Sequence, residues 1–389
     1  MTPAIIGWSH GVFGKFDERS LEDLIVEAAT NAIADANLTP ADIDEIILGH
    51  FNAGFSDQSF TASLVLQTHP DLRFKPATRV ENACASGSAA VFHGARAVES
   101  GSARVVLVVG AEKMTDTKGA AVGENLLRAS YVAEERAIDA GFAGMFGKVA
   151  AAYFDRYGEK SSALAMIAAK NHRNGLENPL AQFRKDLGFE FCLQVSERNP
   201  IVAGPLKRTD CSPVSDGAAA LVIADLDRLS DVRRAVRFRG RSHVHDFLPM
   251  SKRDVLALEG CRRAWENART AAGVVLDDLS LVETHDCFTI AELLQYEAMG
   301  LTPPGEGSRA IELGWTDKGG RLPVNPSGGL KSKGHPIGAT GVSMHVLSAM
   351  QLCDECPEGM QIPGASLAGV FNMGGMGVAN YASILERVR

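Results

Sequence analysis

The sequence predicts an α/β fold built from two related halves with an insertion in the first half. Apolar segments of strand length alternate with segments of helical periodicity, which is typical of α/β layers. Residues 260–288 repeat the pattern of residues 24–52: a helix, a turn, an acidic D-x-[IL] element and an apolar strand that ends near a histidine. The region between the halves is richer in charge and alanine, and we expect it to pack over the first half. The predicted units are an N-terminal half over residues 1–112 and 206–232, an inserted loop domain over 113–205, and a C-terminal half over 233–389.

The first half is predicted to begin with a strand at residues 4–7 and a helix at residues 20–36. The helix starts at a serine N-cap and has two acidic residues in its first turn. The apolar runs 46–48 and 104–110 have the composition of buried parallel strands. One face of the helix carries the apolar residues Leu21, Leu24, Ile25, Ala28, Ala29, Ala32 and Ile33.

The insertion and the second half contain further predicted elements. Helical periodicity occurs at residues 146–156 and 162–172. A turn at residues 211–217 precedes the apolar strand 218–224, and another apolar strand occupies 279–282. In open α/β sheets, sites lie beyond the carboxyl ends of strands, so the residues after 282 are candidates for function.

Composition and charge restrict the class of protein. The chain is 46% hydrophobic and 22% charged with a net charge of −8, so we expect a soluble protein with no nucleic acid as a partner. Its one arginine-rich stretch, 233–241, alternates as on an exposed strand and leaves room for a small anionic ligand. The residues 1–11 have no basic stretch or long apolar core, so we expect no secretory signal, and the apolar runs are too short to span a membrane. Seven scattered cysteines indicate a reducing compartment, and we expect a cytoplasmic location.

A single cysteine, Cys84, precedes a predicted helix that starts near Ser86, in the stretch V-E-N-A-C-A-S-G-S. The positive end of a helix macrodipole favours a thiolate, so this position suits a nucleophile. The alternative is a small buried apolar residue, which many free cysteines are. Other groups that converge on this cysteine would distinguish the two.

Two further loops carry reactive side chains. His285 and Cys287 follow the strand 279–282 and, being two positions apart, are expected to point to the same side. Each could instead be a packed or hydrogen-bonded residue. His335 lies in G-G-L-K-S-K-G-H-P-I-G, where glycine and proline predict a loop and therefore a functional histidine. A metal site has less support, because no HxxxH or acidic ligand spacing accompanies these residues.

Other residues carry less information. Lys331 and Lys333 could meet an anionic ligand or lie in a solvated loop, and His93 has the spacing of a core residue in a helix. The sequence has no GxGxxG after its first strand and no GxxxxGK[ST], so neither type of nucleotide-phosphate loop is predicted. No chemistry is predicted for the remaining candidates, which are His172, His243, His245 and the helix-end pair Cys353 and Cys356.

The motifs N-A-C-A-S-G, S-D-G-A-A-A, H-D-C-F, G-H-P-I-G-A-T-G and G-G-M-G-V-A together resemble those of the thiolases, in the same order and over essentially the whole chain. Most thiolases have N-E-A-F where this chain has H-D-C-F. That variant, with K-N-H-R-N-G-L-E-N-P-L-A-Q-F-R in the insertion, is similar to the sterol-carrier-protein-type thiolases. The resemblance implies a five-layered fold of two similar βαβαβαββ halves with an inserted loop domain, assembled as a homodimer or homotetramer.

The resemblance also implies an acyl-CoA acyltransferase with ping-pong chemistry, in which coenzyme A is substrate and product and no other cofactor or metal takes part. Cys84 matches the nucleophile and His335 the histidine that deprotonates it. The second cysteine of most thiolases, in a C-x-G motif, is replaced here by Phe371. In H-D-C-F enzymes the acid–base role passes to the cysteine of that motif, which is Cys287.

Two oxyanion sites follow from the same resemblance. His285 and His335 would bind the thioester oxygen. The Cys84 N–H and an amide of the turn at residues 373–374, placed at Gly374, would bind the other oxyanion. Residues 141–150 are our candidate for a wall beside the pantetheine of coenzyme A.

Two alternatives stay open from the sequence. One is a Claisen-condensing synthase of the same superfamily, and the other is a non-catalytic scaffold that binds coenzyme A or a partner enzyme. The presence of both cysteines and both histidines argues against a scaffold.

Overall fold

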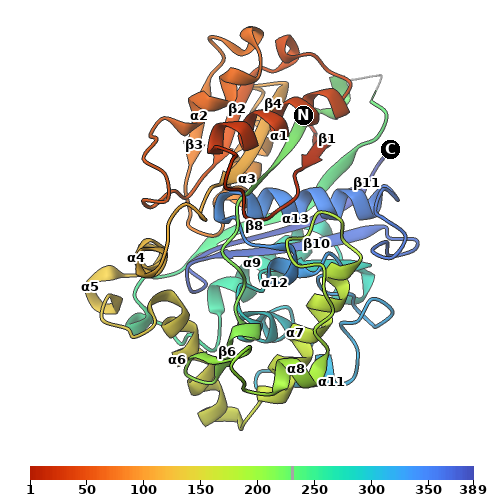
Figure 1. Ribbon diagram of the computed structural model, residues 1–389. Helices are drawn as coiled ribbons and strands as arrows, with labels where there is room; N and C mark the ends of the chain where they lie inside the picture. The colour runs from red at the N-terminus through yellow and green to blue at the C-terminus, as the bar shows by residue number, and fades with distance from the viewer. Residues whose placement is uncertain (229–231) are drawn as a thin grey trace.

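The computed structural model describes residues 1–228 and 232–389 and contains one mixed nine-stranded sheet, in the order β3-β2-β4-β7-β1-β8-β11-β10-β9 (Figure 1). A separate hairpin pairs two short strands, β5 and β6. The strands are β1 (Pro3–His10), β2 (Glu45–Gly49), β3 (Ala77–Val80), β4 (Val105–Glu112), β5 (Ile201–Ala203), β6 (Leu206–Lys207), β7 (Gly217–Asp225), β8 (Val236–His245), β9 (Leu281–Thr284), β10 (Leu367–Gly374) and β11 (Ala379–Arg387).

The strand order repeats, which confirms the predicted duplication. β1, β2, β3, β4 and β7 lie in the order β3-β2-β4-β7-β1, and the second half continues as β8-β11-β10-β9. Val324 forms a parallel bridge with Val282 of β9, at the position that β3 holds beside β2. The halves join where β1 pairs with β8 at Ala4 and Arg237.

Helices cover both halves and lie between them. The α-helices are α1 (Leu21–Asp35), α2 (Thr61–Leu64), α3 (Ser86–Ser100), α4 (Ala120–Leu127), α5 (Val132–Glu135), α6 (Gly141–Tyr157), α7 (Ser161–Leu176), α8 (Phe189–Leu193), α9 (Glu259–Ala272), α10 (Thr289–Ala298), α11 (Gly307–Glu312), α12 (Gly329–Lys333) and α13 (Ile337–Leu352). α1 packs on β1 and β7, α9 packs on β8 and β11, and α13 contacts α3 and strands of both halves. The order of layers is therefore helix, first half of the sheet, the helices α3 and α13, second half of the sheet, helix, as expected for five layers.

The first helix shows how directly local sequence sets an element. Ser20 accepts a hydrogen bond from the N–H of Asp23 at 3.1 Å, and the Asp23 carboxylate accepts from the N–H of Ser20 at 2.8 Å. This capping box begins α1 where the sequence predicts it. All seven residues of the predicted apolar stripe are buried against the sheet.

α3 and α13 approach each other through glycine at their N-terminal ends. A Cβ on Gly87 would lie 2.7 Å from the backbone N of Val342, and one on Gly341 would lie 2.1 Å from that of Ser88. Only glycine permits this backbone contact. The contact brings the loop before α3 and the loop before α13 together.

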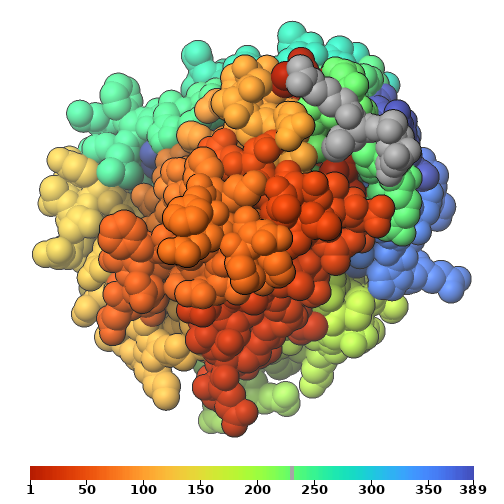
Figure 2. Space-filling view, turned by 90° about the horizontal axis from the view of Figure 1, so that it is seen from above, coloured from red at the N-terminus to blue at the C-terminus, as the bar shows by residue number. Residues whose placement is uncertain are grey.

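The inserted region contacts the second half more than the first, which corrects the expectation that it packs over the first half. α7 packs on α10, α11 and α12, and α6 contacts α10. Phe146 of α6 stacks on Phe288, with ring centroids 4.4 Å apart. α6, α7 and α8 lie below the sheet in Figure 1, on the side away from α1 and α2. Viewed from above, the centre of the surface is formed by residues of the first part of the chain (Figure 2).

Two surface features complete the fold. His93 is exposed on α3, so its prediction as a core residue is wrong; the position lies outside the buried face of that helix. Among the described residues, no helix is long and apolar enough to cross a membrane.

Candidate active site

The four predicted side chains meet where three loops converge. Cys84 precedes α3, His285 and Cys287 lie between β9 and α10, and His335 lies between α12 and α13. All four are buried, with exposed fractions of 3%, 0%, 2% and 7%. The Cys84 sulfur and one ring nitrogen from each histidine lie within 4.8 Å of one another. Cys84 and Cys287 line the same cavity.

The backbone turns sharply before the nucleophile candidate. Ala83 has a φ of 49°, in the left-handed region that residues other than glycine rarely adopt. The Ser86 hydroxyl donates to the Ala83 carbonyl at 2.7 Å and accepts from the Asn82 N–H at 2.9 Å. These bonds fix the turn, so Cys84 is held at the start of α3.

The Cys84 thiol is protonated in the resting site, because burial outweighs the effect of the nearby N–H groups, which favours the thiolate as expected. Burial raises the pKa of Cys84 to about 12, while the N–H groups of Gly375 and of Cys84 itself lower it to a smaller extent. The free energy needed to transfer an anion out of water is larger than the electrostatic stabilisation that a helix N-terminus provides. A base must therefore accept the proton when the sulfur reacts.

His335 has the tautomer of a base. Its Nδ1 lies 2.6 Å from the Thr340 hydroxyl, and that hydroxyl donates to the Pro336 carbonyl at 3.0 Å. The hydroxyl can then only accept from the ring, so Nδ1 carries the proton and Nε2 keeps its lone pair. Burial, followed by the charge of Lys333, lowers the pKa of His335 to about 3, so the ring is neutral.

His285 has the opposite tautomer. The Asn372 amide donates to His285 Nδ1 at 2.8 Å, so Nε2 carries the proton. His285 Nε2 has no hydrogen-bond partner among the residues that the structure describes. Burial lowers the pKa of His285 well below its ordinary value. A neutral ring with a free N–H can donate to a developing oxyanion.

Sequence reasoning missed Asn372. Its amide also lies 3.4 Å from the Cys84 carbonyl, so it connects two of the loops. It is in F-N-M, one position after Phe371, the residue that replaces the usual cysteine. A buried polar residue in a strand that ends in a Gly-rich turn was the available signal.

Cys287 is a buried, protonated thiol that lines the same cavity as Cys84. Burial raises the pKa of Cys287 well above its ordinary value. Its carbonyl accepts from the Ser212 N–H at 2.9 Å, which ties this loop to the S-P-V-S-D-G turn. Cys287 can therefore give a proton to a substrate in this cavity.

The structure changes the amide expected beside Cys84. The N–H group directed at the thiol is that of Gly375, whereas Gly374 belongs to β10 and its carbonyl accepts from Val378 at 3.0 Å. Gly374 matters in another way, because a Cβ there would lie 2.2 Å from the Asn82 carbonyl. Its glycine lets the turn pack against the cysteine loop.

A cavity of about 680 Å³ leads to these residues. Phe142 and Ala143, from the candidate wall at residues 141–150, lie in its lining. Exposed cationic side chains also line it, and these are Lys185, Arg198 and Arg208. Apolar side chains also line the cavity, among them those of Met114, Leu126 and Phe288.

Three residues differ from expectation around this cavity. His172, for which no chemistry was predicted, lines it, and its Nδ1 has no partner in the described parts of the chain. Lys331 and Lys333 are 3% and 0% exposed, so the solvated-loop alternative is wrong. The Lys331 ammonium donates to the Cys211 carbonyl, which explains how that charge is accommodated.

A buried thiol beside a neutral imidazole, with N–H donors near both, equips an enzyme to hold an acyl group on cysteine. The chain belongs to the thiolase family and is an acyltransferase. It matches the family described as Thiolase, N-terminal domain over residues 4–227 and that described as Thiolase C-terminal domain-like over residues 242–387.

Curated relatives extend this result. The chain is 36% identical to an acetyl-CoA acetyltransferase of Methanothermobacter thermautotrophicus over 392 residues, which cover 99% of each chain. It is 32% identical to sterol carrier protein 2 of Oryctolagus cuniculus, over 94% of this chain and 68% of that one.

Two solved structures share the fold. An Ltp2-ChsH2(DUF35) aldolase aligns with a TM-score of 0.82 at 24% identity, covering 100% of this chain and 98% of that one. Acetyl-CoA acetyltransferase from Syntrophomonas wolfei aligns with a TM-score of 0.72 at 18% identity, covering 99% of each.

Proposed function

We propose that the protein is a thiolase that transfers acyl groups between coenzyme A thioesters, cleaving 3-oxoacyl-CoA with coenzyme A or condensing two acyl-CoAs. The observation that carries this proposal is the opposed tautomers of two histidines beside one buried thiol. His335 offers a lone pair and His285 offers an N–H. The Cys84 sulfur lies within 4.8 Å of a ring nitrogen of each.

In the first half-reaction, His335 Nε2 takes the proton of Cys84 while the sulfur attacks the 3-oxo carbon. The oxyanion that forms accepts from the N–H groups of Cys84 and Gly375. The bond between the α and β carbons then breaks, and its electron pair passes to the α carbon as an enolate. The enolate oxygen accepts from Nε2–H of His285 and of protonated His335, and the Cys287 thiol protonates the α carbon.

In the second half-reaction, the Cys287 thiolate takes the proton of the coenzyme A thiol. The coenzyme A sulfur attacks the acyl group on Cys84, and the Cys84 thiolate leaves and recovers its proton from His335. Every proton returns to its starting residue, and condensation is the same sequence in reverse. Because burial favours the neutral thiol and the neutral imidazole, we expect proton transfer to accompany carbon–sulfur bond formation.

Several broader features belong to the same proposal. Coenzyme A is substrate and product, with no other cofactor and no metal, and the exposed cations of the cavity would face its phosphates. The protein would act in lipid metabolism in the cytoplasm as a homodimer or homotetramer. We retain the division into halves of 1–112 with 206–232 and of 233–389, separated by the loop domain 113–205.

Two cysteine variants test the assignment. Cys84→Ala and Cys287→Ala are each expected to abolish thiolysis of acetoacetyl-CoA. Acetyl transfer to the enzyme requires Cys84 and its base, whereas the leaving coenzyme A thiolate, which Cys287 would protonate, can also take its proton from water. Cys287→Ala should therefore still gain the mass of one acetyl group from acetyl-CoA, more slowly than wild type, while Cys84→Ala should not. A panel of short, long and branched 3-oxoacyl-CoA substrates then defines the acyl group.

Specific outcomes would favour another function. If Cys287→Ala retains near wild-type thiolysis, the second thiol is assigned wrongly. If the wild-type protein becomes acylated but does not cleave 3-oxoacyl-CoA, a Claisen-condensing synthase is favoured. If the wild-type protein neither cleaves 3-oxoacyl-CoA nor becomes acylated, a non-catalytic CoA-binding scaffold is favoured.

A further inference from the structure

The inserted helix α7 and the turn after it carry three asparagines whose side chains all donate into the second half. Asn171 donates to Asp286 at 2.8 Å and to Glu292 at 2.6 Å. Asn174 donates to the Asn325 carbonyl at 3.0 Å, and Asn178, just beyond the helix, donates to the Ser327 carbonyl at 2.9 Å. All three are buried, at 2% exposure or less. The asparagines of K-N-H-R-N-G-L-E-N are therefore structural contacts across the two parts of the chain.

Asp286 receives the first of these bonds and has an unusual position. It lies between His285 and Cys287 in the sequence, and its carboxylate accepts from the N–H groups of Leu330 and Lys331 at 2.7 and 3.1 Å. Leu330 and Lys331 belong to α12, which ends two residues before His335. One carboxylate thus connects the loop of Cys287 and His285 to the segment that carries His335.

Glycine makes this connection possible. A Cβ on Gly329 would lie 2.3 Å from the Asp286 carboxylate, so a side chain there would displace it. A Cβ on Gly328 would lie 2.6 Å from the Cα of Gly175 in α7. A backbone hydrogen bond also joins the insertion to α12: the Phe183 N–H donates to the Ser332 carbonyl at 3.0 Å. α7 and α12 are consequently in contact at backbone distance, and α7 cannot shift without moving α12.

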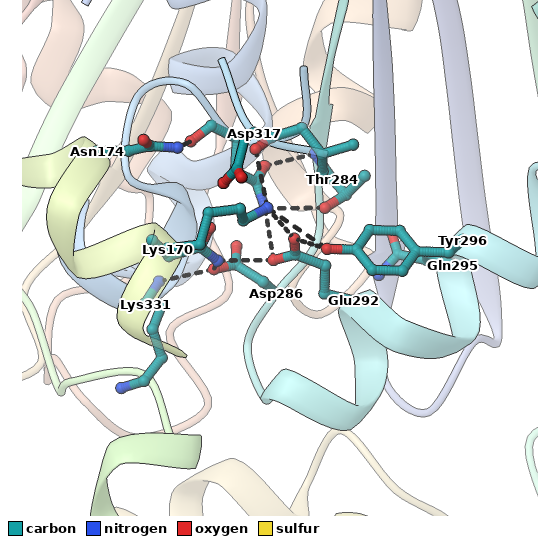
Figure 3. A network of polar contacts seen from close by, with 12 residues as sticks. Lys170, Asn174, Thr284, Asp286, Glu292, Gln295, Tyr296, Asp317 and Lys331 are labelled. Carbon is teal, nitrogen blue, oxygen red and sulfur yellow. Dashed lines mark hydrogen bonds and ion pairs between the residues drawn. The ribbon is translucent and has the colours of Figure 1, made fainter. Parts of the chain in front are cut away.

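Charges inside the network are compensated from the insertion. Lys170 of α7 pairs with Glu292 at 2.5 Å and donates to the Val324 carbonyl at 3.0 Å. Figure 3 shows Lys170 and Tyr296 converging on Glu292, with Asp286 beside it. A buried carboxylate is retained only where donors and a counter-charge surround it. α7 supplies both, through Asn171 and Lys170.

We propose that Asp286 and Asn171 are positioning residues, which hold the Cys287 loop and the His335 segment at the spacing that catalysis requires. The insertion then determines catalytic geometry in addition to lining the substrate cavity. The inference rests on the proposed thiolase function, because it needs Cys287 and His335 to act on one substrate. Neither Asp286 nor Asn171 lines the cavity, so substrate affinity should change little when either is altered.

Asp286→Asn and Asn171→Ala test the proposal. In Asp286→Asn one accepting oxygen becomes an NH2 group, which faces either the donor of Leu330 or those of Lys331 and Asn171. A displacement of about 1 Å at reacting groups can cost about 10²-fold in rate, so we expect kcat to fall by roughly 10²-fold. KM should change by less than about threefold, because uniform binding is retained. Asn171→Ala should lower kcat in the same direction, and Asp286→Asn/Asn171→Ala should lose little more than Asp286→Asn alone.

Asn174→Ala is the matched control. It removes a buried amide from the same helix, but that amide bonds to the Asn325 carbonyl and not to Asp286. We expect its thermal stability to fall as in Asn171→Ala while its kcat stays within about threefold of wild type. Exchange of the α protons of acetyl-CoA with deuterium gives an independent readout of Cys287, and it should slow in Asp286→Asn and Asn171→Ala only.

The outcomes separate this inference from the proposed function. If the wild-type protein shows no thiolase activity, the proposed function itself is overturned. An active wild type, with kcat and proton exchange unchanged in folded Asn171→Ala or Asp286→Asn, would overturn the positioning role. Equal losses of kcat in Asn174→Ala and Asn171→Ala would also overturn it, since the effect would then be general to the helix. If Asp286→Asn does not fold, the comparison of Asn171→Ala with Asn174→Ala decides alone.

Discussion

At the scale of single residues, one hydrogen bond decides what each histidine can do. Thr340 accepts from Nδ1 of His335 and leaves Nε2 as a base, whereas Asn372 donates to Nδ1 of His285 and leaves Nε2 as a donor. Both rings are buried and neutral, so their roles differ only through the neighbour that faces Nδ1. Base and oxyanion donor are therefore set by residues that do not touch the substrate.

Asn372→Leu should remove the preference for one tautomer of His285. The substitution keeps the approximate size of the side chain but takes away the amide that donates to Nδ1. A share of the rings would then place the proton on Nδ1 and lose the Nε2–H donor, so we expect kcat to fall by about tenfold, less than for complete loss of an oxyanion donor. The ring nitrogen chemical shifts of His285 should show two tautomers by NMR. An unchanged kcat and a single Nε2–H tautomer would contradict this assignment.

Zinc should inhibit the enzyme reversibly. Cys84, His285 and His335 present one sulfur and two nitrogens within 4.8 Å of one another, and thiolate with imidazole is a ligand set that Zn²⁺ prefers. Coordination by His285 requires its proton to leave Nε2, which the Asn372 donor at Nδ1 opposes, so we expect modest affinity. The bound ion would block the nucleophile, so inhibition should be competitive with acyl-CoA and should be relieved by a chelator. Direct measurement of bound zinc should show weaker binding in Cys84→Ser and unchanged binding in Cys287→Ala. Equal zinc binding by Cys84→Ser and wild type would place the inhibitory ion elsewhere.

At the scale of elements, local sequence predicted what local physics controls. The cap and the apolar stripe of α1 are encoded within its own 15 residues, and both are as expected. The contacts of the insertion are not local, because they depend on Asn171, Asn174 and Asn178 reaching partners more than 100 residues away. The burial of Lys331 and Lys333 depends on the same packing. The sequence of this Gly-rich loop alone could therefore not show whether the two lysines are buried or solvated.

Gly341→Ala should destabilise the contact between α3 and α13. The new Cβ would lie 2.1 Å from the backbone N of Ser88, and backbone cannot move aside as a flexible side chain can. Overpacking of this kind costs typically about 1–3 kcal/mol, which urea denaturation measures. Because the shifted helices carry Cys84 and His335 at their starts, acylation should slow as well.

Gly123→Ala is the matched control for that substitution. Gly123 lies inside α4, and a Cβ there would meet no atom within 4 Å. Replacing a helical glycine by alanine at an unobstructed site should raise the free energy of unfolding by roughly 0.5–1 kcal/mol. If both variants lose the same stability, the close contact of α3 with α13 is not the cause.

At the scale of the whole molecule, the site lies where the two halves meet. The repeat between residues 24–52 and 260–288 predicted the duplication, and β2 and β9 occupy equivalent places in it. The third strand of the second half is reduced to a bridge at Val324, so no strand-like run marked it in the sequence. The roles of the four reactive residues could be proposed from motifs, but the neutral resting state could not, because it results from burial by both halves.

Acid should destabilise the fold through buried neutral histidines, and His345 isolates the effect from catalysis. Its Nδ1 lies 2.7 Å from the Gly341 carbonyl and its Nε2 lies 3.0 Å from the Ser383 hydroxyl. Burial lowers the pKa of His345 from 6.5 to about 4. Between these values the unfolded chain binds a proton that the folded chain does not, so the free energy of unfolding falls as the pH falls from 6.5 toward 4.

His345→Gln should remove this contribution while keeping one donor and one acceptor. We expect the dependence of the unfolding free energy on pH to become shallower by up to about 1.4 kcal/mol per pH unit in that window, measured by urea denaturation. Asp286 and Glu283, whose pKa values burial raises, act in the opposite direction but are the same in both proteins. Ser383→Ala is the control, because it loses the hydrogen bond but keeps the imidazole, so its stability should fall while the pH dependence stays that of wild type. An unchanged pH dependence in His345→Gln would show that this ring is charged in the folded protein, and its burial would then need a counter-ion.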